Sequence, residues 1–175
     1  MKTLQDFLQV IHNLPERAGQ PPRMTPANPQ EQLEQFPSDW SVIEQLGAIA
    51  FRLADVKEAP TQIAPPGSRA LTLGAAHATP EREAFMVDLE FAHIHNPPIG
   101  SMHLTLPPVL REAAASKGWV LRHPMAVRGM VSPDVVFAFA PRDAGELAAS
   151  QLLLSAAHAY ATGTLGARST LLTAD

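Results

Sequence analysis

The sequence predicts an α+β domain in which a mixed or mainly antiparallel sheet of about five or six strands is flanked by three helices. Three observations support this fold class. Apolar residues recur with the helical period of 3.6 up to about residue 54, and with the strand period of 2 afterwards. Short turns rich in proline and glycine join several of the strands, as expected for antiparallel neighbours. Single helices interrupt the strands, and no internal repeat is present.

Size and composition limit the classes of function. The 175 residues, 46% of them hydrophobic, are enough for one domain with its own core. Cysteine is absent, which excludes disulfides, thiolate metal sites and a cysteine nucleophile. The formal net charge is −4 and no lysine or arginine run occurs, so we expect no nucleic-acid or membrane partner. A signal peptide and a membrane span are not predicted, and a cytoplasmic location is expected.

The N-terminal segment is predicted to differ from the rest of the chain. Residues 3–13 carry one apolar stripe of a short helix that Thr3 could cap. Prolines then recur up to residue 37 and indicate an extended arm. The arm could wrap the domain, join a neighbouring chain in a homo-oligomer, or extend loosely. We therefore expect an arm at residues 1–37, the domain at residues 38–163 and a C-terminal tail at residues 164–175.

The elements of the domain follow from local signals. Ser38 and the acidic residues after it predict a helix over residues 39–54. Prolines open a second helix at residues 108–117, and Asp143 caps a third that continues to residue 161. Strands are expected at residues 56–63, 69–73, the second half of 84–95, 101–106, 119–127 and 135–140.

Three of the seven histidines lie close together in the sequence, at His93, His95 and His103. In a hairpin that closes symmetrically around Pro98, His93 lies opposite His103 and His95 lies opposite Ser101. Side chains alternate along a strand, so all three imidazoles would share one face. The same alternation places Phe91 on the face of His93, and Ser101 and Thr105 on the face of His103. A bulge in this hairpin would separate the imidazoles.

Three interpretations of this histidine cluster are open. Three neutral imidazoles suit a divalent metal such as Zn²⁺, Fe²⁺ or Cu²⁺. However, the familiar metal hairpin has a carboxylate shortly after its second histidine, where this chain has Asn96 and two prolines, and strict alternation places Glu90 on the opposite face. The second interpretation is acid–base chemistry without metal, in which Ser101 and Thr105 position a polar substrate. The third is structural, with each imidazole satisfied by loop carbonyls.

Other candidates are single residues. His123 could join the site, although exposure to solvent is slightly favoured. Arg142 could bind an anionic group, but a structural ion pair is the expected role, and Asp143 is expected to cap a helix. The sequence lacks the nucleotide-binding glycine motifs, the serine-hydrolase elbow and the HExxH zinc motif, so no certain cofactor is predicted.

Four short blocks occur in order along the chain: residues 90–95 (EFAHIH), residues 100–107 (GSMHLTLP), Gly118-Trp119 with His123-Pro124, and residues 140–143 (APRD). Together they resemble the luciferase-domain family, a group of bacterial and fungal proteins that includes the fungal luciferases. The resemblance covers about residues 56–162 and leaves out the N-terminal arm.

The resemblance implies an activity for the histidine cluster. Fungal luciferases add molecular oxygen to a hydroxylated α-pyrone without a known nucleotide or metal requirement. They carry an N-terminal membrane segment, which the sequence does not predict here. By analogy, the three histidines would deprotonate the substrate, and the resulting carbanion would react with oxygen. An apolar wall would come from Phe91, Met102, Trp119 or Phe137.

The expected function is therefore oxygenase-like chemistry on a small phenolic or pyrone-type compound in a histidine-lined pocket. Molecular oxygen is the possible co-substrate, and a divalent metal is possible. The expected catalytic residues, also the metal candidates, are His93, His95 and His103, and the substrate-binding candidates are Phe91, Ser101, Thr105, Trp119, His123 and Arg142. The alternatives are a non-catalytic small-molecule or metal-binding domain and a structural oligomer subunit.

Overall fold

A six-stranded antiparallel sheet forms the centre of the protein in a computed structural model, which describes residues 2–165. The strands lie in the order β1-β2-β3-β4-β6-β5, and every neighbouring pair is antiparallel. This confirms the α+β class and resolves the sheet as antiparallel. The strands are β1 (Val56–Pro60), β2 (Arg69–Leu73), β3 (Glu90–Ile94), β4 (Met102–Thr105), β5 (Val120–Arg122) and β6 (Val135–Ala138).

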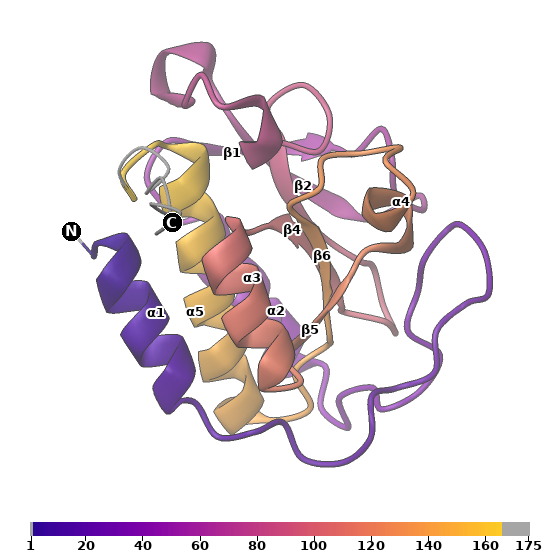
Figure 1. Cartoon of the computed structure of the whole chain (residues 1–175). Helices are drawn as coiled ribbons and strands as arrows, with labels where there is room; N and C mark the ends of the chain where they lie inside the picture. Colours follow the sequence, from indigo (N-terminus) through magenta and orange to yellow (C-terminus); the bar gives the residue numbers. More distant parts are fainter. Residues whose placement is uncertain (1, 166–175) are drawn as a thin grey trace.

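Four helices cover one face of this sheet, whereas the short α4 and the arm lie on the other side (Figure 1). The four are α1 (Leu4–Asn13), α2 (Ser41–Ala50), α3 (Pro108–Ser116) and α5 (Ala144–Ala161), and α4 spans Pro124–Val127. None of the helices within residues 2–165 combines the length and the apolar character needed to cross a membrane. Most of the tail expected at residues 164–175 lies outside the described residues.

The main core fills the space between the sheet and the four helices. One side of each inner strand supplies it, as Leu71, Ile94, Leu104 and Val136 show, and all four are almost fully buried. The long helix α5 packs across β3 and β4 with Leu153 and Leu154 buried beneath it. The alternating residues on these strands point to the other face, where the histidines lie.

Two elements differ from the prediction. Helix α2 is shorter than residues 39–54, because it spans Ser41–Ala50. Its N-cap is Trp40 and not Ser38, and the Asp39 carboxylate just before it accepts hydrogen bonds from the amide and hydroxyl of Ser41. The strand expected at residues 119–127 ends at Arg122, and α4 follows. Pro124 stands at the first turn of α4, where a proline lacking an amide hydrogen favours a helix start over a strand. The cap predicted for α1 is confirmed, with Thr3 and Asp6 in a capping box.

The arm after α1 runs beneath the helices to the opposite side of the sheet (Figure 1). It is attached by hydrogen bonds along its course. The indole nitrogen of Trp119 donates to the Pro15 carbonyl at 3.0 Å, and the Gln32 side chain accepts from the Ala140 amide at 3.0 Å. The arm therefore packs on the domain, while oligomerisation through it stays a prediction.

The β3–β4 hairpin has the register expected from the sequence. His93 pairs with His103, and the His95 amide donates to the Ser101 carbonyl at 2.9 Å. At the turn, Gly100 has a φ of +68° and lies against Ile43 of α2, where an added Cβ would come within 2.6 Å of the Ile43 side chain. Only glycine fits this position without displacement, so the turn is held close to α2.

A bulge lies on the other edge of β3. Leu71 pairs with Ala92 and Thr72 pairs with Glu90, so that Phe91 is the extra residue. The bulge interrupts the alternation, and Glu90 comes to the same side as His93. Phe91 instead joins the core under the helices, with its ring 5.9 Å from that of His158 in α5. The expectation that Phe91 shares the histidine face is therefore wrong.

Candidate functional site

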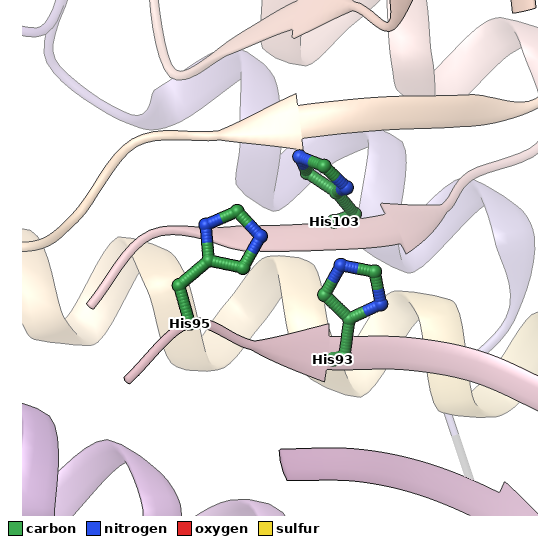
Figure 2. A group of neighbouring side chains, drawn as sticks. All are labelled: His93, His95 and His103. Carbon is green, nitrogen blue, oxygen red and sulfur yellow. The ribbon is translucent and has the colours of Figure 1, made fainter. Parts of the chain in front are cut away.

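The three predicted histidines converge on one side of β3 and β4. His93 and His95 extend from β3 and its end, and His103 extends from β4, with all three rings on the same side (Figure 2). One nitrogen from each ring lies within 4.8 Å of the corresponding nitrogen of the other two. The His103 ring is 4.7 Å from each of the other rings, and all three residues are buried.

Each imidazole of the cluster is held at one nitrogen and left without a partner at the other. Nδ1 of His93 donates to the Glu90 carboxylate at 2.7 Å, and Nδ1 of His95 bonds the Ser101 hydroxyl at 3.1 Å. His103 has a hydrogen bond with the backbone of Gln30 in the arm. The Nε2 atoms of all three are buried and have no hydrogen-bond partner among the described residues. The structural interpretation, in which loop carbonyls satisfy both nitrogens, therefore does not account for the cluster.

Glu90 is the residue of this candidate site that the sequence reasoning missed. Strict alternation placed it on the helix side, and the bulge at Phe91 turns it to the histidine side. Its carboxylate is buried, and the Thr61 hydroxyl donates to the same oxygen that meets His93, at 3.1 Å. An acidic residue in an otherwise apolar strand was the available signal, but the bulge itself has no mark in the sequence.

A fourth imidazole, His123, borders the cluster. Its ring centre lies 4.5 Å from that of His103, and the residue is 7% exposed, so the slight preference for solvent was wrong. His123 caps α4, and its Nδ1 accepts a hydrogen bond from the Met125 amide at 3.2 Å. A neutral imidazole that accepts at Nδ1 carries its hydrogen on Nε2, which makes His123 a hydrogen-bond donor at that atom.

Burial keeps His95, His103 and His123 neutral near pH 7. Loss of hydration, followed by repulsion from His93 and His123, lowers the pKa of His95 to about 3. Loss of hydration and then repulsion from His93 lower the pKa of His123 to about 4. The same loss of hydration holds the pKa of His103 well below its usual value. Neutral imidazoles are good ligands and hydrogen-bond partners, but with such low pKa values they accept a proton poorly.

A cavity of about 540 Å³ ends at His103 and His123. Three segments surround it: the arm at residues 28–30, the β1–β2 loop at residues 62–65, and the region around α4. Its wall is mostly apolar and includes Pro29, Ile63, Met86, Met125, Val131 and Val135. The cavity thus joins an apolar chamber to the edge of the histidine cluster.

Two further candidates lie near the cluster but serve different contacts. Ser101 supports His95, as described above, and is fully buried. Thr105 shares the face of His103 as expected, yet its hydroxyl donates to the Ala84 carbonyl at 2.7 Å. Phe137, a candidate for the apolar wall, does adjoin the cluster, with its ring 5.0 Å from His103.

The remaining candidates lie away from the cluster. Trp119 and Met102 belong to the core beneath the helices. Arg142 forms an ion pair with Glu146 at the start of α5 and donates to the Ala18 carbonyl of the arm at 2.9 Å. The structure thus gives Arg142 the structural ion pair that its position suggested, and it does not bring Arg142 to the cavity.

Comparison with known proteins finds similarity in the region of this site. Residues 88–157 match the model of the Luciferase domain. This confirms the resemblance to the luciferase-domain family. The luciferases of Armillaria gallica and Armillaria mellea are each 36% identical to the chain over 75 residues, and that of Armillaria ostoyae is 35% identical over the same length. No solved structure matches the chain.

The luciferase-domain match is confined to part of each protein. The aligned region is 42% of this chain and 28% of each Armillaria luciferase, so the chain spans less than a third of the length of these curated relatives. The matched residues 88–157 contain Glu90, the three clustered histidines and His123. The arm that covers the cavity lies outside the match.

Proposed function

We propose that the protein is an oxygenase-like enzyme that binds a small phenolic or pyrone-type compound in the histidine-lined cavity, with molecular oxygen as co-substrate. The observation that supports this most is a largely apolar cavity of about 540 Å³ that ends at two buried imidazoles. The luciferase-domain match supports this class of reaction.

The cavity suits a flat aromatic compound with a few oxygen substituents. Its volume falls within the range of about 300–1,000 Å³ that small-molecule sites occupy. Apolar side chains such as Ile63, Met125 and Val131 would contact the ring. His123 would donate from Nε2 to an oxygen of the substrate, which orients that oxygen toward the cluster.

The low pKa values affect the choice of base. His95, His103 and His123 would hold a substrate proton weakly at pH 7. His93 is the cluster histidine with a carboxylate behind it, since Glu90 accepts from its Nδ1 in the arrangement that a catalytic triad uses. In a reaction without metal, His93 is thus our candidate for the group that finally holds the proton.

Oxygen consumption tests this function. Purified protein, with and without added Fe²⁺, is mixed with a panel of hydroxylated α-pyrones and substituted phenols, while oxygen uptake, light emission and product mass are recorded. We expect uptake with at least one compound, reduced about 100-fold or more in His103→Ala. The control His77→Ala, at an exposed position away from the cavity, should retain full activity.

The same panel separates the enzyme from its alternatives. Saturable binding without oxygen uptake or product would contradict the enzyme and support the non-catalytic small-molecule domain. The metal-binding alternative is favoured by the three unpartnered Nε2 atoms. A homo-oligomer through the arm, the lack of a nucleic-acid partner and a cytoplasmic location stay predictions from the sequence.

A further inference from the structure

We propose that His93, His95 and His103 bind one divalent first-row transition-metal ion through their Nε2 atoms, with Glu90 as the outer carboxylate that orients His93. This site is independent of the proposed oxygenase activity, because an ion can bind whether or not a substrate is turned over. Three features of the cluster support this site: the unpartnered nitrogens, the groups that hold the opposite nitrogens, and the burial of the Glu90 carboxylate.

The unpartnered nitrogens are the first observation. Three buried polar atoms without a hydrogen-bond partner lie together in one cluster, although proteins usually satisfy nearly all such atoms. The carboxylate of Glu90 can only accept, so His93 carries its hydrogen on Nδ1 and exposes a lone pair at Nε2. The Gln30 contact of His103 falls to Nδ1 because Nε2 has no partner. The Ser101 hydroxyl can accept from Nδ1 of His95, which gives that ring the same tautomer. Three imidazole nitrogens gathered in this way suit a shared cation.

The groups behind the imidazoles are the second observation. Metal-binding histidines usually donate their other N–H to a carboxylate, a backbone carbonyl or another oxygen, which selects the tautomer and fixes the ring. Here the corresponding oxygens come from Glu90, from Ser101 and from the backbone of Gln30. The cluster thus has both the ligands of a metal site and the outer contacts that orient them.

The burial of the Glu90 carboxylate is the third observation. This carboxylate is 3% exposed, and among the described residues it meets the His93 imidazole and the Thr61 hydroxyl. A buried anion is stable only when a cation or several donors compensate it. A metal ion on the far side of His93 would supply positive charge while leaving the imidazole neutral and coordinated.

The ligand set selects the class of ion. Three imidazoles suit Zn²⁺, Fe²⁺, Co²⁺ or Cu²⁺, whereas Mg²⁺ and Ca²⁺ prefer oxygen ligands. Nitrogens bound at about 2.0–2.1 Å in a tetrahedral site lie about 3.3 Å apart. The present nitrogens lie within 4.8 Å of one another, so modest movements of the rings would complete the coordination. Three protein ligands leave a position open for water or a substrate oxygen.

Cobalt binding is the direct test. The full chain is stripped with EDTA, dialysed and titrated with Co²⁺, and the visible absorption of the ion is followed with calorimetry of Zn²⁺ binding alongside. We expect one equivalent of either ion and a cobalt spectrum of low coordination number. The double variant His95→Ala/His103→Ala should lose the spectrum, and the control His77→Ala should keep it.

A milder variant guards against misfolding. Glu90→Gln retains the size of the side chain and an acceptor for His93 but removes the negative charge. We expect it to keep one site and to weaken Zn²⁺ binding about 10–100-fold. Circular dichroism of each metal-free variant establishes that it is folded before it is compared.

The outcomes divide clearly. A folded wild-type chain that binds neither ion at millimolar concentration would overturn the proposal, as would binding that survives the double histidine variant or is lost equally in His77→Ala. If Glu90→Gln binds Zn²⁺ as tightly as the wild type, Glu90 has no part in the metal site. The metal titration contains no organic substrate, so failure to bind an ion does not decide the oxygenase proposal, which oxygen uptake tests. Likewise, absence of oxygen uptake does not decide whether the metal site exists.

Discussion

Individual imidazoles set the chemical character of this site. Alternation along the hairpin was enough to predict that three histidines would share a face, because their register depends on local pairing around one turn. The residues that contact these histidines were not predictable in the same way. Glu90 reaches His93 only through a bulge, and His123 reaches His103 only because a strand ends early at Pro124. Both changes depend on contacts distant in the sequence.

Neutral buried imidazoles predict a stability that falls in mild acid. In the metal-free protein, His95 has a pKa of about 3 against an ordinary 6.5, so the unfolded chain binds more protons between these values and stability decreases as pH falls from about 6.5. From pH 7 to pH 5, His95 alone accounts for about 2 kcal/mol. Urea unfolding in EDTA at pH 7 and pH 5 measures this change.

The interval from pH 7 to pH 5 is chosen to separate this effect from that of the carboxylates. Carboxylates with lowered pKa values, such as those of Asp39 and Glu58, lose their contribution to stability mainly at lower pH. The variant His123→Ala should show a smaller dependence on pH, because it lacks one of the depressed groups. Equal stability at the two pH values would show that the cluster is already protonated or hydrated in the folded protein.

At the scale of elements, the hairpin and the arm together make the cavity. The hairpin supplies His103, while the arm supplies residues 28–30 to the same cavity. The prolines of the arm predicted an extended segment, but its path depends on individual bonds to the domain. Gln32 makes several of these bonds. It is 1% exposed, and its side chain forms hydrogen bonds with the backbone of Ala140, Glu34 and Gln35.

Removal of this side chain should loosen the arm. We expect Gln32→Ala to lower the free energy of unfolding by about 1–3 kcal/mol, because the buried Ala140 amide loses its acceptor. Denaturant unfolding gives the stability, and hydrogen exchange at residues 24–35 gives the local effect. Gln20→Ala, an exposed glutamine of the same arm, is the control and should change neither. Protection that stays unchanged in Gln32→Ala would show that other contacts hold the arm.

For the whole molecule, the two faces of the sheet have separate tasks. One face packs against four helices and provides the core, and the arm lies on the other side (Figure 1). The histidines belong to that other face, where His103 and arm residues 28–30 line one cavity. Helix α1 belongs to the first group, because Phe7 and Ile11 are buried among core residues next to α3 and α5. The N-terminal segment therefore contributes a structural element as well as a cover for the cavity.

This arrangement predicts that α1 unfolds together with the domain. We expect Ile11→Ala to cost about 2–5 kcal/mol, since Ile11 is fully buried and its loss leaves a cavity in the core. Val10→Ala, at an exposed position one residue earlier, should stay within about 0.5 kcal/mol of the wild type. Thermal and urea unfolding measure both. Similar small effects for the two variants would place α1 outside the cooperative unit.

The sequence alone determined the fold class, the positions of most strands and helices, and the pairing of His93 with His103, because these depend on local periodicity and on one short turn. Only the tertiary structure decided that Phe91 enters the core, that Glu90 supports His93, and that the arm closes the cavity over His103. A bulge and a wrapped arm are selected by packing between distant segments, and that packing leaves no periodic trace in the residues themselves.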